Sequence, residues 1–68
     1  MFTEFITEKN NRRASVYQVK SENSFSTKYC IELYEGDNLV VRDYKTNYDQ
    51  CKNLSELYVE KIYNPTIL

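Results

Sequence analysis

Residues 25–34 read Phe-Ser-Thr-Lys-Tyr-Cys-Ile-Glu-Leu-Tyr, and this segment decides the fold. Apolar or β-branched side chains alternate with mostly polar ones from Phe25 to Leu33, in a stretch rich in aromatic residues. This period of two predicts a β-strand with one buried face. The single glycine, Gly36, lies just beyond in Glu-Gly-Asp-Asn, where a tight hairpin turn needs a positive φ. Residues 39–44 are therefore predicted to be the returning strand.

Two more strands are predicted upstream of this segment. Residues 12–20 form one strand, and the turn-forming residues 21–24 separate it from the next. Residues 2–9 pair back onto it through Asn10-Asn11, because asparagine tolerates the left-handed conformation of a two-residue turn. The first hairpin is thus predicted from its turn chemistry.

The pairing of these strands follows from the turns. The Asn-Asn turn places Glu8 opposite Arg13 and Phe5 opposite Val16, both favourable cross-strand pairs. A short helical turn over residues 2–7 is the competing interpretation, because apolar side chains there also fit helical spacing. The strand is preferred.

The next register depends on the length of the second turn. If Lys20 lies opposite Phe25, Val16 faces Tyr29. The same register places Ala14 opposite Ile31. A slip of one residue would exchange the two faces of a strand.

The last third of the chain has a helical period. Residues 47–63 are predicted to form a helix, with Thr46 or Asn47 as its N-cap and Asn64-Pro65 ending it. One apolar stripe follows this spacing: Tyr48, Cys51, Leu54, Tyr58 and Ile62. The chain is therefore predicted to be a single α+β domain. A three- to four-stranded antiparallel meander over about residues 2–44 carries one helix on one face, and a short tail spans residues 64–68.

The two faces of this sheet differ in what can cover them. One face should meet the helix stripe, and it collects Phe5, Ala14, Val16, Phe25, Tyr29, Ile31 and Leu33. The last strand adds to the other face either Leu39 and Val41 or Val40 and Tyr44. A lone helix leaves that second face bare, which predicts an interaction surface. Its candidate contact residues are Tyr17, Val19, Cys30, Tyr34, Leu39 and Val41. The alternative is that these residues have no binding function, because single exposed tyrosine and valine side chains are common on a pleated sheet surface.

Composition excludes most chemistry. The 68 residues carry nine Lys and Arg against ten Asp and Glu, and they include no His, one Gly and two Cys. Without histidine there is no base for a cysteine nucleophile and no zinc-ligand set, and one glycine cannot build a phosphate loop. We therefore expect no enzyme activity, no metal and no cofactor. The sequence also shows neither a long apolar run nor a secretory signal, so we expect a cytoplasmic protein that does not enter membranes.

Single-stranded nucleic-acid binding is the alternative function. Tyr17, Lys28 and Tyr34 could form a stacking platform on the bare face. Further basic residues lie on neighbouring strands: Arg12, Arg13, Lys20 and Arg42. Acidic residues interrupt any continuous positive stripe, and the net charge of −1 opposes phosphate binding. A protein partner is therefore preferred.

Three short segments resemble a known group of proteins. They are Ala-Ser-Val-Tyr at residues 14–17, Ile-Glu-Leu-Tyr-Glu-Gly at 31–36 and Ser-Glu-Leu-Tyr-Val-Glu at 55–60. In these segments the chain resembles the small accessory proteins of marine tailed bacteriophages, including T4-like cyanophages. The resemblance implies a factor made during infection that binds a host protein in the host cytoplasm, and it brings no catalytic residues. Self-association through the same face is the variant expectation.

Overall fold

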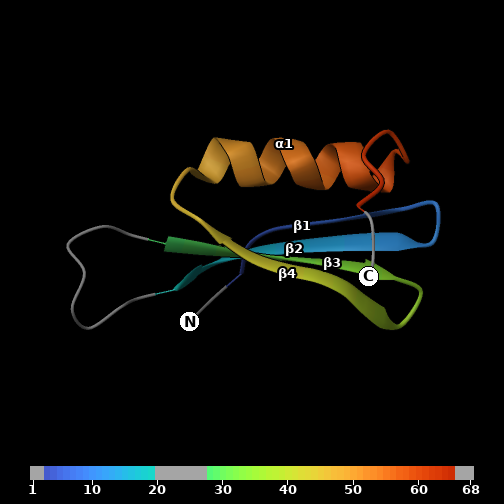
Figure 1. Cartoon of the computed structure of the whole chain (residues 1–68), viewed down its shortest axis with the longest axis horizontal. Coiled ribbons are helices and arrows are strands. Elements are labelled where there is room, and N and C mark those ends of the chain that lie inside the picture. The colour runs from blue at the N-terminus through green and yellow to red at the C-terminus, as the bar shows by residue number, and fades with distance from the viewer. Residues whose placement is uncertain (1–2, 20–27, 66–68) are drawn as a thin grey trace.

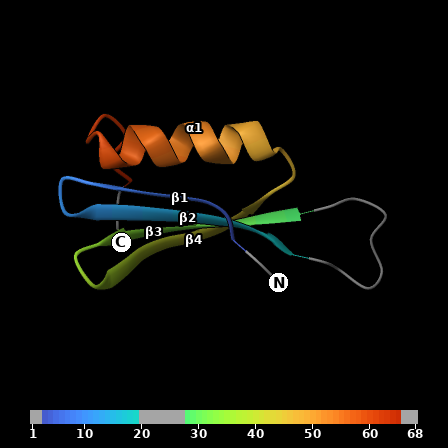
Figure 2. The ribbon, with the colours of Figure 1, turned by 180° about the vertical axis from the view of Figure 1, so that it is seen from behind.

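The computed structural model describes residues 3–19 and 28–65 (Figure 1). The elements are β1 (Thr3–Lys9), β2 (Arg12–Val19), β3 (Lys28–Glu35), β4 (Asn38–Lys45) and α1 (Tyr48–Val59). The strands form one antiparallel sheet in the order β1-β2-β3-β4. Helix α1 lies along one face of this sheet, as the view from behind also shows (Figure 2). The predicted α+β meander with a C-terminal helix is confirmed.

The first hairpin has the predicted turn and register. Asn10 and Asn11 have φ angles of 55° and 63°, the left-handed pair that a type I′ turn requires. Glu8 pairs with Arg13 across the two strands. Phe5 pairs with Val16, as predicted, although an irregularity lies between Thr3 and Phe5. The helical-turn alternative for this segment is wrong, because residues 3–9 pair along β2.

The register between β2 and β3 differs from the prediction by two residues. Val16 pairs with Ile31 rather than with Tyr29, and Ala14 pairs with Leu33 rather than with Ile31. A shift of two leaves every side chain on the same face, because the side-chain period of a strand is also two. The predicted faces therefore survive an incorrect register. The expected pairing of Lys20 with Phe25 lies outside the described residues, and so does Phe25.

The β3–β4 hairpin closes through two residues. Glu35 pairs with Asn38, and Gly36 has a φ of +60° in the turn, where the sequence predicted this requirement. The Gly36 amide also donates to the Asn11 carbonyl oxygen at 2.8 Å. This bond ties the two hairpin turns together at one end of the sheet.

A β-bulge in β4 decides which way this strand faces. Tyr34 pairs with Leu39, but the next pair is Leu33 with Val41, so Val40 is the extra residue. The bulge lets Leu39 and Val41 lie on opposite faces. Val41 packs against the core below α1, and its predicted place among the interaction residues is wrong. Simple alternation could not reveal this, because an inserted residue reverses the parity of the strand.

The core lies between α1 and one face of the sheet. Its fully buried members are Ala14, Val16, Ile31, Leu33, Cys51, Tyr58 and Val59, and Phe5, Tyr29, Val41, Tyr48, Leu54 and Tyr63 pack around them. The predicted helix-facing residues are confirmed within the described chain. The predicted stripe of α1 is confirmed except for Ile62, which is 69% exposed.

Helix α1 begins at the predicted cap and ends early. Asn47 Oδ1 accepts the Gln50 amide at 3.1 Å. The helix stops at Val59, rather than at residue 63, because Lys61 has a φ of +64°. The Ile62 amide then donates to the Leu57 carbonyl at 2.9 Å, which is the hydrogen bond of a Schellman motif that spans more residues. Ile62 therefore lies past the helix and away from the core. Of the predicted tail, residues 66–68 lie outside the described residues.

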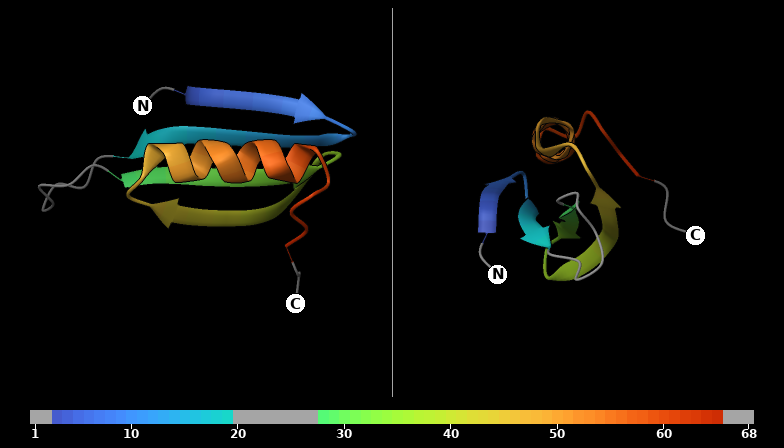
Figure 3. Two further views of the ribbon diagram at one scale, coloured as in Figure 1. Left: turned by 90° about the horizontal axis from the view of Figure 1, so that it is seen from above. Right: turned by 90° about the vertical axis from the view of Figure 1, so that its left-hand side faces the viewer.

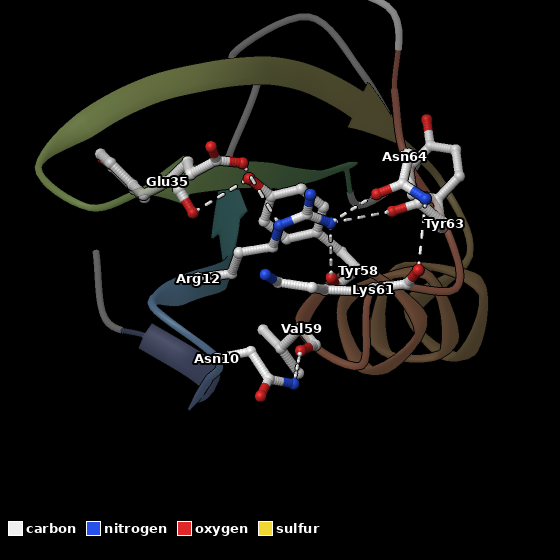
Figure 4. Close-up of polar contacts among 9 residues, drawn as sticks. Asn10, Arg12, Glu35, Tyr58, Val59, Lys61, Tyr63 and Asn64 are labelled. Atoms are coloured by element: carbon white, nitrogen blue, oxygen red, sulfur yellow. Dashed lines mark hydrogen bonds and ion pairs between the residues drawn. The ribbon is translucent and has the colours of Figure 1, made fainter.

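Arg12 holds this end of the helix against the sheet (Figure 4). Its Nη1 donates to the Tyr58 carbonyl at 3.1 Å and to Asn64 Oδ1 at 2.8 Å. The guanidinium lies 4.7 Å from the centre of the Tyr58 ring, and its Nε is 3.3 Å from Glu35 Oε1. A cation at a helix C-terminus also complements the helix dipole. The Arg12 side chain is therefore committed to the fold.

Candidate functional site

The sheet presents its second face on the side away from α1 (Figure 3). We call this surface the open face. The strand register assigns to it Ile6, Glu8, Arg13, Ser15, Tyr17, Val19, Lys28, Cys30, Glu32, Tyr34, Leu39, Arg42 and Tyr44. Five of the six predicted interaction residues belong to this set, and Val41 does not. For the last strand, each predicted alternative is half right, because the bulge leaves Leu39 and Tyr44 on the open face.

A buried carboxylate lies at the centre of the open face. Glu32 is only 8% exposed. Its Oε2 accepts from Arg42 Nε at 2.8 Å, and its Oε1 accepts from the Tyr34 hydroxyl at 3.2 Å. The carboxylate raises the pKa of Arg42, mainly through this hydrogen bond. Both oxygens therefore have partners, as a carboxylate with so little contact with water requires.

The row beside Glu32 contains a covered thiol. Cys30 pairs with Tyr17 on one side and with Tyr44 on the other. It is 1% exposed, so it cannot serve as the docking contact that the sequence predicted. The pKa of the Tyr17 hydroxyl is raised, first by its hydrogen bond with the Cys30 side chain, then by burial and by Glu32. Tyr17 is itself only partly exposed.

The other cysteine lies on the opposite side of the sheet. Cys51 is in the core beneath α1, and burial raises the pKa of its thiol. Both cysteines are free. They lie on the two sides of the sheet, so no disulfide joins them.

Exposed apolar side chains lie toward the two edges of the open face. On edge strand β1, Ile6 is 57% exposed; on edge strand β4, Leu39 is 43% and Tyr44 is 56% exposed. Between these edges, the Arg13 guanidinium lies 4.4 Å from the centre of the Tyr34 ring. The bare face predicted from the sequence is therefore not apolar throughout. The surface consists of a paired polar centre between apolar edges.

The roles of two residues of the open face, Glu32 and Arg42, were not predicted from the sequence. No role was predicted for Glu32, and Arg42 was predicted only as one of the basic residues of the nucleic-acid alternative. The missing information was the pairing of Glu32 with Arg42 across β3 and β4, which depends on the bulge. An acidic residue in the middle of an otherwise apolar strand was the available signal, because such a residue needs a partner when the strand is paired on both sides.

Comparisons with known proteins identify no relative. The chain matches no protein-family model, no curated protein and no solved structure. Its function is therefore inferred from the geometry of the open face.

Residues 3–19 and 28–65 contain neither a cluster of candidate metal-ligand side chains nor a helix that could span a membrane. Within these ranges, no three His, Cys, Asp or Glu side chains gather as ligands. Helix α1, the one helix in these ranges, is too short and too polar to cross a bilayer.

Proposed function

We propose that this chain is a small non-enzymatic interaction module that binds a protein partner through the open face. The observation that carries the proposal is the exposure of Ile6, Leu39 and Tyr44 on the sheet side that α1 leaves bare. About half of the surface of each of these side chains is exposed, so a partner that covers them buries additional apolar area. The chain has no His and its two thiols are buried, which favours binding over catalysis.

The polar centre suits an interface because its side chains are already held in place. Glu32 fixes Arg42 and Tyr34, while Arg13 stacks on Tyr34. Side chains ordered before binding lose less conformational entropy when a partner arrives. Tyrosine and arginine are also the residue types enriched among the energetically dominant contacts of protein interfaces. Tyr17 and Tyr34 remain candidate anchors, together with Tyr44 and Leu39.

The resemblance to phage accessory proteins extends this proposal. On that basis, the partner is a host protein, and binding takes place in the host cytoplasm. A second copy of the chain is the variant occupant, in which self-association would compete with binding of the host protein. Both uses need the same exposed edges of the open face.

Nucleic-acid binding is the weaker alternative. Arg12, one of the basic residues on which it relied, is committed to the end of α1. The Tyr34 ring carries the Arg13 guanidinium on one side, which leaves less of it for base stacking. Lys20 lies outside the described residues. The net charge of −1 also opposes phosphate contacts.

The proposal is tested with two matched double variants. Leu39→Ser/Tyr44→Ser removes exposed apolar side chains from the open face. Leu57→Ser/Ile62→Ser removes two exposed apolar side chains on the helix side of the molecule. Leu57 is 40% exposed on α1, and Ile62 is 69% exposed just beyond its end. Tagged wild type and both variants are used for quantitative affinity capture from bacterial lysate. The molar mass of each protein is measured by sedimentation at low and high concentration. Circular dichroism establishes that all three are folded.

We expect a specific protein to be captured by wild type and by the α1 variant but lost by the open-face variant. The purified pair should then show slowed amide exchange in β4 on binding. Dimerisation that only the open-face variant abolishes would identify a second copy as the occupant. Equal capture by both variants, with no self-association, would contradict the proposal.

A further inference from the structure

A buried acid holds the guanidinium of Arg42 in place on the open face. Nε of Arg42 donates to Glu32 Oε2 at 2.8 Å, and the two side chains are 52% and 10% exposed. The Tyr34 hydroxyl occupies the other oxygen of the Glu32 carboxylate. The arginine is thus anchored from the sheet side, while half of its side chain remains in contact with solvent.

The anchoring leaves most donors of this guanidinium unused. Across the described ranges 3–19 and 28–65, Nε is the one guanidinium nitrogen of Arg42 with a hydrogen-bond partner. A guanidinium has five N–H donors, of which four belong to the two terminal Nη groups. Two parallel donors of this kind match the two oxygens of a carboxylate. Arg42 therefore has the free donors that a second carboxylate requires.

The exposed charges of the open face on β2, β3 and β4 are positive. Arg13, Lys28 and Arg42 are exposed, whereas Glu32 is buried and already paired. The other described acid of this face, Glu8, lies on the opposite edge strand and pairs across the hairpin with Arg13. An incoming carboxylate at Arg42 thus meets no exposed acid on β3 or β4 within this face. Charge complementarity favours a partner with a negative group here.

Apolar side chains lie on either side of Arg42 along the open face. Tyr44 lies two residues along β4 on the same face, and Leu39 lies in the row on the other side of Arg42. Both are exposed. A ligand centred on Arg42 would therefore combine one carboxylate with apolar side chains on either side.

We propose that Arg42 is a recognition site for a carboxylate of the partner protein, supplied by an Asp or Glu side chain flanked by apolar residues. This inference rests on the proposed function, because it names the chemistry that the open face selects. A phosphate backbone is a poorer fit, since the chain is negative overall and the positive groups of the face are few and dispersed. Positioning by Glu32 matters as much as the charge of Arg42.

The test uses a displayed library of random twelve-residue peptides as the probe. Peptides are selected on the intact wild-type chain, and their affinities are then measured for Arg42→Gln, Glu32→Gln and the matched same-face control Lys28→Gln. Thermal unfolding establishes that each variant is folded. The same proteins are titrated with a twelve-residue oligodeoxythymidine, and the peptides are also measured against Leu39→Ser/Tyr44→Ser.

We expect the selected peptides to be enriched in Asp or Glu beside apolar residues. Arg42→Gln should weaken their binding by about tenfold or more, because a charged hydrogen-bonded pair is lost, and Lys28→Gln should weaken it far less. Glu32→Gln is decisive because it makes the protein more positive. If peptides bind through general electrostatic attraction, Glu32→Gln should bind the acidic peptides more tightly than wild type. If they bind a guanidinium that Glu32 positions, Glu32→Gln should bind them more weakly.

Selected peptides without acidic residues, or peptides that bind Arg42→Gln normally, would overturn the carboxylate site. If the Leu39→Ser/Tyr44→Ser variant still abolished their binding, the proposed function would stand. Tighter binding by Glu32→Gln would also overturn the site. If no peptide is selected but the oligonucleotide binds, Arg42 belongs to a phosphate site instead. If no peptide is selected and the oligonucleotide does not bind, both the carboxylate site and the proposed function are overturned.

Discussion

Replacing Arg12 by methionine tests whether a single side chain holds α1 to the sheet. Methionine keeps an unbranched apolar stem but removes the guanidinium. The variant loses two short hydrogen bonds from a charged donor, to the Tyr58 carbonyl and to Asn64, and a longer one to the Tyr63 carbonyl. It also loses the ion pair with Glu35 and the contact with the Tyr58 ring. The Arg12 side chain is only 14% exposed, so water cannot fully replace these partners.

The expected cost follows from these contacts. Hydrogen bonds to a charged group contribute about 1.5–3 kcal/mol, and a partly buried cation–π contact contributes about 1–2 kcal/mol. These contributions overlap because one guanidinium makes all of them, so we expect a total loss of about 3 kcal/mol. A domain of 68 residues has a total stability of about 3–10 kcal/mol. Arg12→Met should therefore be close to the limit of folding.

Equilibrium urea unfolding measures this loss. With a urea dependence of about 1 kcal/mol per molar, the midpoint should fall by about 3 M, or the folded baseline should disappear. Arg13→Met is the matched control, because Arg13 is adjacent in sequence but lies on the open face against Tyr34. An exposed cation–π contact contributes about 0.5–1 kcal/mol, so the control should lose little. Equal shifts for the two variants would refute the assigned role of Arg12.

The remaining predictions concern the helix ends and pH. Lys61→Gly should stabilise the protein by about 1 kcal/mol in thermal unfolding, because the +64° φ of Lys61 strains any residue with a Cβ; Lys61→Ala should give no such gain. Asn47→Ala should cost about 1 kcal/mol in urea unfolding through loss of the N-cap, and an unchanged midpoint would argue against that cap. Folding raises the pKa values of Cys51, Tyr17 and Tyr58 above those of the unfolded chain, so their neutral forms favour the native state at neutral pH. The free energy of unfolding should therefore fall as the pH rises above about 9, first through the thiol and then through the tyrosines, and a flat profile from pH 8 to 11 would contradict these directions.

Local sequence signals predicted the first hairpin and the N-terminus of α1 well. The Asn10-Asn11 turn sets its own register, because few residues other than asparagine and glycine adopt two successive left-handed conformations. Asn47 likewise caps the helix through a hydrogen bond to a residue only three positions away. Such features need no information from distant parts of the chain.

Predictions that depended on long-range contacts were less accurate. The register of β2 on β3 was wrong by two residues because no two-residue turn joins these strands, and the predicted faces survived only because two is the period of a strand. The helix ends before its predicted boundary because Lys61 adopts a left-handed conformation and Arg12, far away in sequence, binds the carbonyl of Tyr58. Proline alone did not determine this boundary.

The candidate interaction surface shows the same division. Alternation placed Tyr17, Tyr34 and Glu32 on the face away from the helix. Whether Cys30 was accessible depended on the tyrosines of the two neighbouring strands, and the direction of Leu39 and Val41 depended on one inserted residue. Neither property can be deduced from a single strand.

The amino-acid sequence alone determined the antiparallel meander, the turns of its first and last hairpins, the one amphipathic helix and the side of the sheet that this helix covers. Periodicity and turn chemistry encode these features, and both act over a few residues. Only the tertiary structure decided that the uncovered side has a buried carboxylate at its centre, with Arg42 anchored above it. That arrangement requires β3 and β4 to pair with a bulge, because Glu32 and Arg42 meet only in the register that the bulge produces.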